Sequence, residues 1–223
     1  MRFRALLAAE RARFDAIVGF RTPKHAERAS YWYLGFVRTL RLEREEGAPA
    51  IVRALLSDSS TWFLSELELA LDATDDASID LLFAAPRASL RTLSIARAGD
   101  PECPHADLLP WTMLPRLEQL RLEGQRIVHD LVHPGVRELW LAGSPMCEPS
   151  WQLPQLTKLA WLHPDVDAFA GLCDAAPPAL RELQLFCVPE SQLRAQLGEL
   201  VRGLPDVQVM WREPIRYRWV RGR

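Results

Sequence analysis

The chain has 223 residues, 48% of them hydrophobic, and a formal net charge of −2 at pH 7. A chain of this size and composition can bury a core without a disulfide or a metal to hold it together. The small net charge gives no electrostatic reason to expect nucleic acid or an anionic membrane as the main partner. The sequence therefore predicts a globular protein whose fold depends on apolar packing.

The cysteine spacing and the hydropathy of the chain argue against disulfide-rich, zinc-binding, secreted and membrane-spanning proteins. The four cysteines are widely spaced and form no CxxC pair, which argues against a zinc site or a disulfide framework: Cys103, Cys147, Cys173 and Cys187. Charged residues interrupt the apolar N-terminal segment, so no signal peptide is expected. The chain also lacks the apolar run of about 18 residues that a spanning helix needs. We expect a cytoplasmic protein that does not enter a membrane.

Residues 2–18 carry apolar side chains at helical spacing, and Gly19 follows them. This pattern predicts an amphipathic helix that ends before the glycine. A polar connector, residues 21–30, leads to the aromatic segment Tyr31–Phe36. We interpret residues 1–36 as an N-terminal helical cap, because a repeat array must cover the apolar end of its first unit. The alternative is that this helix docks another protein.

A hexamer with apolar residues at its first, fourth and sixth positions recurs along the chain. Its clearest copy is Leu117-Glu-Gln-Leu-Arg-Leu122. Eight copies begin at Val37, Leu64, Leu90, Leu117, Val136, Leu156, Leu180 and Leu204. Side chains alternate between the two faces of a strand, so the fourth and sixth residues should enter one core. The third, fifth and seventh residues, the last following the hexamer, should face the other way.

The eighth copy is ambiguous. Leu204-Pro205 also matches Leu114-Pro115, and that match would start the copy at Val207. A start at Leu204 is favoured because Val207, Val209 and Trp211 then alternate on one face.

Successive copies begin 19 to 27 residues apart, which suits a strand followed by a helix or a 3₁₀ turn. The longer steps contain helical patterns at residues 50–56, 79–83 and 193–201. The two short steps, which follow Leu117 and Val136, leave no room for a helix and predict an extended or 3₁₀ return. Residues 215–220 alternate in polarity and predict a closing edge strand within a basic tail.

Three segments of the chain resemble a known protein family. They are Tyr31-Trp-Tyr-Leu-Gly-Phe36, Leu114-Pro-Arg-Leu-Glu-Gln-Leu-Arg-Leu122 and Pro178-Ala-Leu-Arg-Glu-Leu-Gln-Leu185. Over residues 30–211 the chain resembles bacterial leucine-rich repeat proteins, especially those with an aromatic-Gly-Phe entry into the first repeat. The resemblance implies an α/β solenoid: a curved, parallel concave sheet, with helices and 3₁₀ turns on its convex side. It also implies protein binding without catalysis.

The resulting domain prediction has three parts: a helical cap at 1–36, a solenoid of about eight units at 37–211, and a capping strand with a basic tail at 212–223. One departure from the family pattern stands out. The asparagine expected two or three residues after each strand is missing, so the convex turns should be irregular and other groups must satisfy their backbone.

Two short motifs were weighed as metal sites. His129-Asp-Leu-Val-His133 approximates a metalloprotease pattern, which needs both histidines one turn apart on a helix. Here the repeat is too short for a helix and Pro134 follows at once. Cys103, His105 and Asp107 supply at most three ligands. We predict no enzymatic activity, no cofactor and no metal.

The concave face of the predicted sheet is the remaining candidate for a functional site. Large apolar side chains gather there only in the later repeats, which is typical of a protein-binding hot spot. The candidate partner-binding residues are Trp140, Leu162, Phe186 and Met210, with Arg121, Glu138 and Glu182 around them. The alternative is that the apolar residues pack against the C-terminal tail or follow an irregular strand.

Two other functions stay open. The third positions include Glu66, Glu138, Glu182 and Asp206, an acidic column that would suit an inhibitor or immunity protein that occludes a basic enzyme. The tail combines Arg212, Arg216, Arg218, Arg221 and Arg223 with Tyr217 and Trp219, the composition of a single-stranded nucleic-acid contact. Nucleic acid is less favoured because the whole chain is not basic.

Overall fold

The computed structural model covers the whole chain, and most of the repeat region is described in it. The described residues are 8–9, 11–13, 16, 30–33, 36–42, 49–58, 61–72, 82–83, 87–98, 111–123, 131–142, 151–164, 166–186 and 191–212. The predicted closing strand at 215–220 and the arginines after Arg212 lie outside these ranges.

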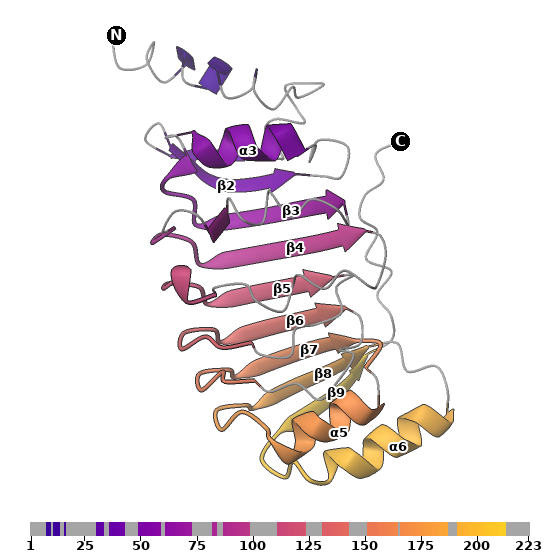
Figure 1. Cartoon of the computed structure of the whole chain (residues 1–223). Coiled ribbons are helices and arrows are strands. Elements are labelled where there is room, and N and C mark those ends of the chain that lie inside the picture. Colours follow the sequence, from indigo (N-terminus) through magenta and orange to yellow (C-terminus); the bar gives the residue numbers. More distant parts are fainter. Residues whose placement is uncertain are drawn as a thin grey trace.

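The described chain forms one open sheet in which the strands follow one another in sequence order (Figure 1). The first strand, β1, is antiparallel to the second, and each later strand pairs in parallel with the one before it. The strands are β1 (Ser30–Tyr33), β2 (Phe36–Leu42), β3 (Glu66–Asp72), β4 (Thr92–Ala98), β5 (Gln119–Glu123), β6 (Glu138–Ala142), β7 (Lys158–Leu162), β8 (Glu182–Phe186) and β9 (Gln208–Arg212). This is an α/β fold built from repeat-like units that each add one parallel strand.

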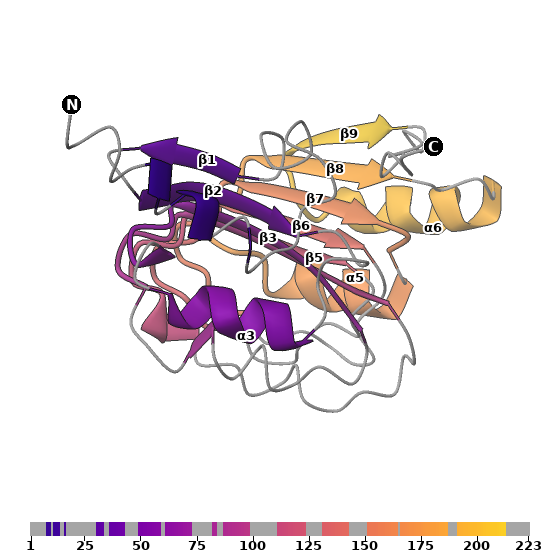
Figure 2. The same cartoon turned by 90° about the horizontal axis from the view of Figure 1, so that it is seen from above.

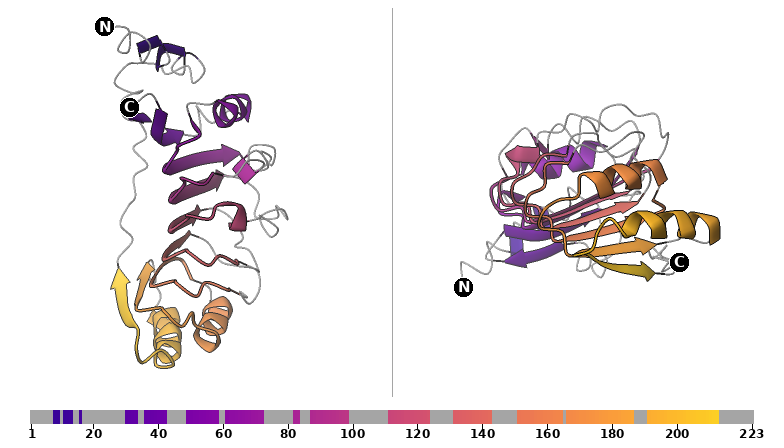
Figure 3. Two further views of the ribbon diagram at one scale, coloured as in Figure 1. Left: turned by 90° about the vertical axis from the view of Figure 1, so that its left-hand side faces the viewer. Right: turned by 90° about the horizontal axis from the view of Figure 1, so that it is seen from below.

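The helices lie on one face of the sheet (Figure 2 and Figure 3). They are α3 (Pro49–Ser57), α5 (Val166–Asp174) and α6 (Ser191–Val201), together with the 3₁₀ helix Trp111–Met113. The helices predicted at 50–56 and 193–201 are therefore confirmed. Helix α5 was not predicted, although Phe169 and Leu172 give it an apolar stripe. No helix in the described ranges is long and apolar enough to cross a membrane.

The core lies between the sheet and these helices. In-register pairing places the fourth residues of the hexamers side by side, from Leu40 to Leu183, and the sixth residues likewise, from Leu42 to Leu185. These side chains are almost completely buried. Full burial of one leucine contributes about 1.5–3 kcal/mol, so the two columns are the main source of stability.

In the later repeats, aromatic side chains pack into the core beside the leucines. Trp161 occupies a sixth position, with its ring centre 6.0 Å from that of Trp151 and 6.1 Å from that of Phe169. Phe169 is fully buried on helix α5. The large ring at position 161 therefore packs directly against helix α5.

Seven of the eight predicted hexamers have the predicted register, and the eighth does not. Gln208 pairs with Glu182 and Val209 with Leu183, so the strand lies two residues later than a start at Leu204 requires. Val209 and Trp211 do pack against the core as predicted. The turn closes from Val207 to Leu204, which is three residues later than a start at Leu204 requires and agrees with the match of Leu204-Pro205 to Leu114-Pro115. One residue fewer than in other repeats separates this turn from the strand, so the net shift is two residues.

The N-terminal prediction is only partly within the described ranges. Residues 8, 9, 11–13 and 16 are helical, as expected for the helix at 2–18. Arg13 forms an ion pair with Asp58 at 3.1 Å, just after helix α3. The segment Ser30–Tyr33, which was expected to be a connector and an aromatic entry, is instead the antiparallel strand β1. It hydrogen bonds to β2 along the edge of the sheet.

A recurring turn leads into the strands. The N–H of the first hexamer residue donates to the carbonyl three residues earlier, for example from Leu64 to Thr61 and from Leu117 to Leu114. We call the accepting residue the turn position; in one repeat it is His133, which accepts from the Val136 N–H through its ring Nδ1 and not its carbonyl. The turn position is buried in every repeat where it is described: Thr61, Arg87, Leu114, His133, Leu153, Pro177 and Leu204. Three of these buried side chains are polar, which no sequence pattern had indicated.

The polar side chains at the turn position bind backbone groups at the end of the sheet where the strands begin. The Thr61 hydroxyl donates to the carbonyl of Leu55 at 2.9 Å or that of Asp58 at 2.8 Å. The Arg87 guanidinium donates to the carbonyl of Leu56 at 2.6 Å, and burial lowers its pKa. Each side chain thus ties one repeat to the segment before it.

His133 has the most complete set of contacts. The N–H groups of Gly135 and Val136 donate to its Nδ1 at 3.0 and 3.1 Å, and its Nε2 lies 3.0 Å from the Leu114 carbonyl. Because Nδ1 accepts, the proton belongs on Nε2 and the ring is neutral. Burial lowers the pKa of His133, although the contact with the Leu114 carbonyl acts in the opposite direction.

We predict that stability depends on pH through His133. Unfolded histidine gains a proton below about pH 6.5, whereas the folded ring resists protonation, so stability is complete above that pH and falls as the pH decreases. Urea unfolding at about pH 7.5 and about pH 5.5 measures this loss, which should shrink in His133→Gln. The variant should also lose about 1–3 kcal/mol at the higher pH, because its backbone contacts are impaired.

The exposed His163 is the matched control for this experiment. It has a φ of 56°, a conformation that asparagine tolerates, so His163→Asn should keep the pH dependence of the wild type. An equal loss of stability in wild type and His133→Gln would show that the buried ring is not the source.

Candidate functional site

The face opposite the helices carries the third, fifth and seventh residues of the strands, and we call it the open face. Pairing aligns them in columns across β2 to β9. The third column is Thr39, Glu66, Thr92, Gln119, Glu138, Lys158, Glu182 and Gln208. The fifth column runs from Arg41 through Arg121, Trp140, Ala160 and Gln184 to Met210. No helix covers this face in the described part of the chain (Figure 3).

A small apolar cluster lies on the open face, separate from the main core. It consists of Trp140, Ala160, Leu162 and Phe186. Trp140 and Ala160 are register partners across β6 and β7, and Leu162 and Phe186 are register partners across β7 and β8. Three of the four predicted apolar residues, Trp140, Leu162 and Phe186, lie in this cluster, and the small Ala160, which was not predicted, lies among them.

Trp140 is fixed from the neighbouring strand. The guanidinium carbon of Arg121 lies 4.0 Å from the centre of a Trp140 ring, within the range of a cation–π interaction. Arg121 also forms an ion pair with Glu123 on its own strand at 3.4 Å. Arg121, which was predicted from the sequence to lie beside the cluster, is therefore in contact with it. Glu123, two residues after Arg121 on β5, holds the arginine in place. That spacing was visible in the sequence, but Glu123 was not proposed.

The prediction that Phe186 is an exposed anchor is wrong. Only 4% of the residue is exposed, compared with the half-buried Trp140 and Leu162. Its register partners, Leu162 on β7 and Arg212 on β9, lie on either side of it. A ring enclosed in this way stabilises the sheet but offers little surface to a partner.

Met210 also occupies a different place from the predicted one. The two-residue shift of β9 puts it opposite Gln184 in the fifth column, while Arg212 takes the place beside Phe186. The Arg212 Nη2 lies 3.5 Å from the Met210 sulfur. Met210 is half-buried and lies at the margin of the face, so the apolar cluster does not extend through β9 in the way proposed.

The predicted acidic residues differ in their surroundings. Glu182 forms an ion pair with Lys158 at 3.6 Å and accepts a hydrogen bond from Gln184. Glu138 is exposed, and its carboxylate has no ion-pair partner among the described residues. Asp206, predicted in the third column, precedes β9, and Gln208 takes its place. The third column is therefore only partly acidic.

The residues weighed for catalysis have structural roles where they are described. Both ring nitrogens of His133 contact the backbone, so neither is available to a metal. The pKa of Cys173 is raised to about 11, first by burial and then by Asp174, which makes it an unreactive thiol. The described ranges contain no group of three or more potential metal-ligating side chains. His129, Cys103, His105 and Asp107 lie outside them.

Comparison with known proteins adds no relative to this description. No protein-family model matches the chain, and no curated protein matches it at a significant level. The candidate function must therefore be argued from the open face and its residues.

The burial of Phe186 predicts a structural effect of its removal. Phe186→Ala should lower the free energy of unfolding by about 3 kcal/mol, because truncation leaves a cavity between β7 and β9. Gln208→Ala, an exposed change on the neighbouring strand, is the control and should stay within about 0.5 kcal/mol of wild type. Urea titration measures both. A loss below about 1 kcal/mol for Phe186→Ala would show that the ring is not packed as described.

Proposed function

We propose that the chain is a leucine-rich repeat protein of the bacterial type that binds a protein partner on its open face and has no catalytic activity. The observation that supports this most strongly is the fixed tryptophan on that face. Trp140 is half-buried, held by Arg121 at 4.0 Å and surrounded by register-aligned side chains. A rigid aromatic ring loses little entropy on binding and is a frequent anchor in protein interfaces.

Three features support the repeat assignment. Each unit contributes one parallel strand, its apolar residues fall in the same columns, and the same turn precedes the strand. In the described part of the chain, helices α3, α5 and α6 lie on the same face of the sheet (Figure 2). Parallel strands stacked in sequence order with their helices on one side are the arrangement that leucine-rich repeats adopt.

The charges around Trp140 support a partner with an apolar and a basic side chain. Glu138 lies two residues away on the same strand and is exposed, whereas Arg121 on β5 is already engaged. A partner that places an apolar side chain against Trp140 and Leu162, and a basic side chain near Glu138, would match this surface. Such a partner would bury the apolar area and neutralise the exposed carboxylate.

An inhibitor or immunity protein that occludes an enzyme is the alternative. It rests on the acids of the third column, Glu66, Glu138 and Glu182. Lys158 neutralises Glu182, and Gln119 and Gln208 interrupt the column, so this charge pattern is weaker than the sequence suggested. Binding that weakens steeply with salt would favour this alternative, and binding that tolerates salt would favour the apolar contact.

The test begins with capture of a partner from cells of the source organism by the intact chain, followed by titration calorimetry. Trp140→Ala should weaken binding by about 2 kcal/mol, and Glu138→Lys by about 1 kcal/mol or more through charge repulsion. Arg202→Ala, an exposed change just after helix α6, should leave the affinity unchanged. Unchanged affinity in Trp140→Ala, with the fold intact by circular dichroism, would reject the open face as the binding surface.

A further inference from the structure

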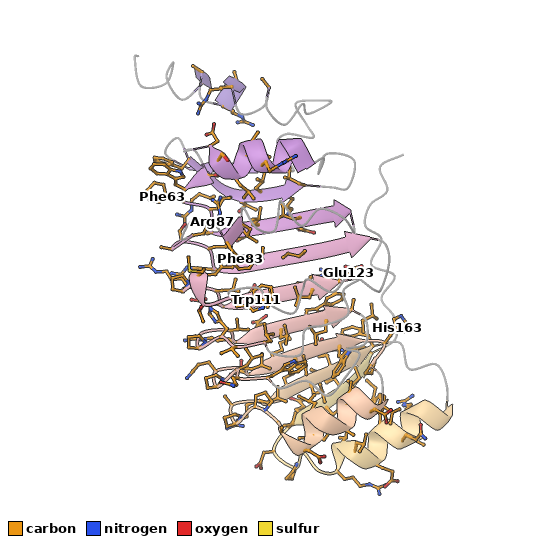
Figure 4. The ribbon with its side chains drawn as sticks, in the orientation of Figure 1. Phe63, Phe83, Arg87, Trp111, Glu123 and His163 are labelled. Carbon is orange, nitrogen blue, oxygen red and sulfur yellow. The ribbon has the colours of Figure 1, made fainter. Side chains whose placement is uncertain are left out.

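A second surface lies where the parallel strands begin. We call it the entry rim: in each repeat, it runs from the residue before the turn position to the second residue of the hexamer. All five large apolar side chains that are exposed in the described part of the chain lie here: Phe36, Trp62, Phe63, Met113 and Val132. Figure 4 shows Phe63 at this end of the sheet, opposite the strand ends marked by Glu123 and His163.

The aromatic part of the rim is strongly exposed. Trp62 is 65% and Phe63 is 47% accessible. The Phe36 and Phe63 rings meet edge to face with centres 4.6 Å apart, so they fix each other without being covered. Exposed apolar groups scattered singly need no explanation, but a gathering at one end of a sheet indicates an interaction site.

Prolines continue this apolar surface. The place after the turn position holds Trp62 and Ala88, and then Pro115, Pro134, Pro154, Pro178 and Pro205, all exposed. Proline is favoured at the second residue of a tight turn, so the fold itself explains these residues. Their consequence for binding is a stiff stripe that has no N–H groups and loses little entropy when covered.

The rim is basic although the chain as a whole is not. The second hexamer position is arginine in alternate repeats: Arg38, Arg91, Arg137 and Arg181, with Arg116 close by. Arg91 pairs with Glu118 at 3.0 Å. Arg116 and Arg137 are exposed, and neither has an ion-pair partner in the described ranges. Glu118 and Asp206 are the acids on the described rim, so positive charge predominates there.

We propose that the entry rim binds an acidic segment of a partner protein that also carries apolar side chains. The turn holding Trp62 precedes β3, and Arg137 leads into β6, three strand spacings or about 14 Å away. About four or five extended residues span that distance. The segment places an aromatic or aliphatic side chain against Trp62 and Phe63, and carboxylates near Arg116 and Arg137. This contact is separate from the open face and does not depend on it.

Single-stranded nucleic acid fits the rim less well than an acidic peptide. Base stacking needs exposed ring faces along the strand, whereas the rim offers Met113, Val132 and prolines beyond its aromatic end. The net charge of −2 also opposes a long polyanion more than a short acidic segment.

The test is selection of peptides from a random displayed library on the intact protein, followed by fluorescence polarisation with a selected peptide. We expect enrichment of acidic peptides with an aromatic or aliphatic residue. Arg116→Glu/Arg137→Glu and Trp62→Ala should each weaken binding at least about tenfold. Arg194→Glu/Arg202→Glu, on α6 and just after it, makes the same charge change at exposed sites and should have less than about a twofold effect. Binding by Trp140→Ala should equal that of wild type.

Circular dichroism must first show that all variants are folded, and each of the following results would then contradict the proposal. Selected peptides without an acidic bias, or an equal loss in the α6 control, would overturn the proposal. Loss in Trp140→Ala but not in the rim variants would assign the peptide to the open face instead. Binding of an oligothymidylate probe that needs Arg116 and Arg137, with no acidic peptide selected, would replace the proposal with a nucleic-acid contact.

Discussion

In-register pairing of neighbouring strands is the constraint on which the other features depend. When Leu120 lies beside Leu93 and Leu139, every residue of β5 has a fixed neighbour on both sides. The leucines then form columns in the core, and the residues between them form columns on the open face. A shift of one residue would expose the leucines, so the apolar core that stabilises the fold also determines which side chains are presented together.

The turns into the strands add a second constraint. Buried polar side chains at the turn position bind backbone groups where the strands begin. Thr61, Arg87 and His133 do this with three different chemical groups. The turn geometry also puts prolines and Trp62 in one exposed line. The turns that bury these side chains thereby also determine which residues are exposed on the rim that we propose as a contact surface.

Much of the fold was predictable because its signal is periodic. The spacing of Leu117, Leu120 and Leu122 recurs with few exceptions and predicted seven of eight strand registers. The eighth failed because its turn lies three residues later than predicted, as the alternative match of Leu204-Pro205 to Leu114-Pro115 had indicated. Its entry into the strand is also one residue shorter, which is seen only in the hydrogen bonds of Val207 and Gln208, so the register moves by two residues and the face is unchanged. The burial of Phe186 depends on neighbours from two other strands, and the role of His133 depends on Leu114 in another repeat. Sequence periodicity carries no information about such contacts.

The strand order also bears on how the chain folds. Each strand from β3 to β9 pairs with the one before it, so the chain closes short loops and has no need to bring distant segments together first. Assembly can then start at one unit and spread to its neighbours. We expect the first unit to form around Trp161, where Trp151 and Phe169 supply large apolar surfaces close together in the chain. Growth would proceed from there in both directions, one strand at a time.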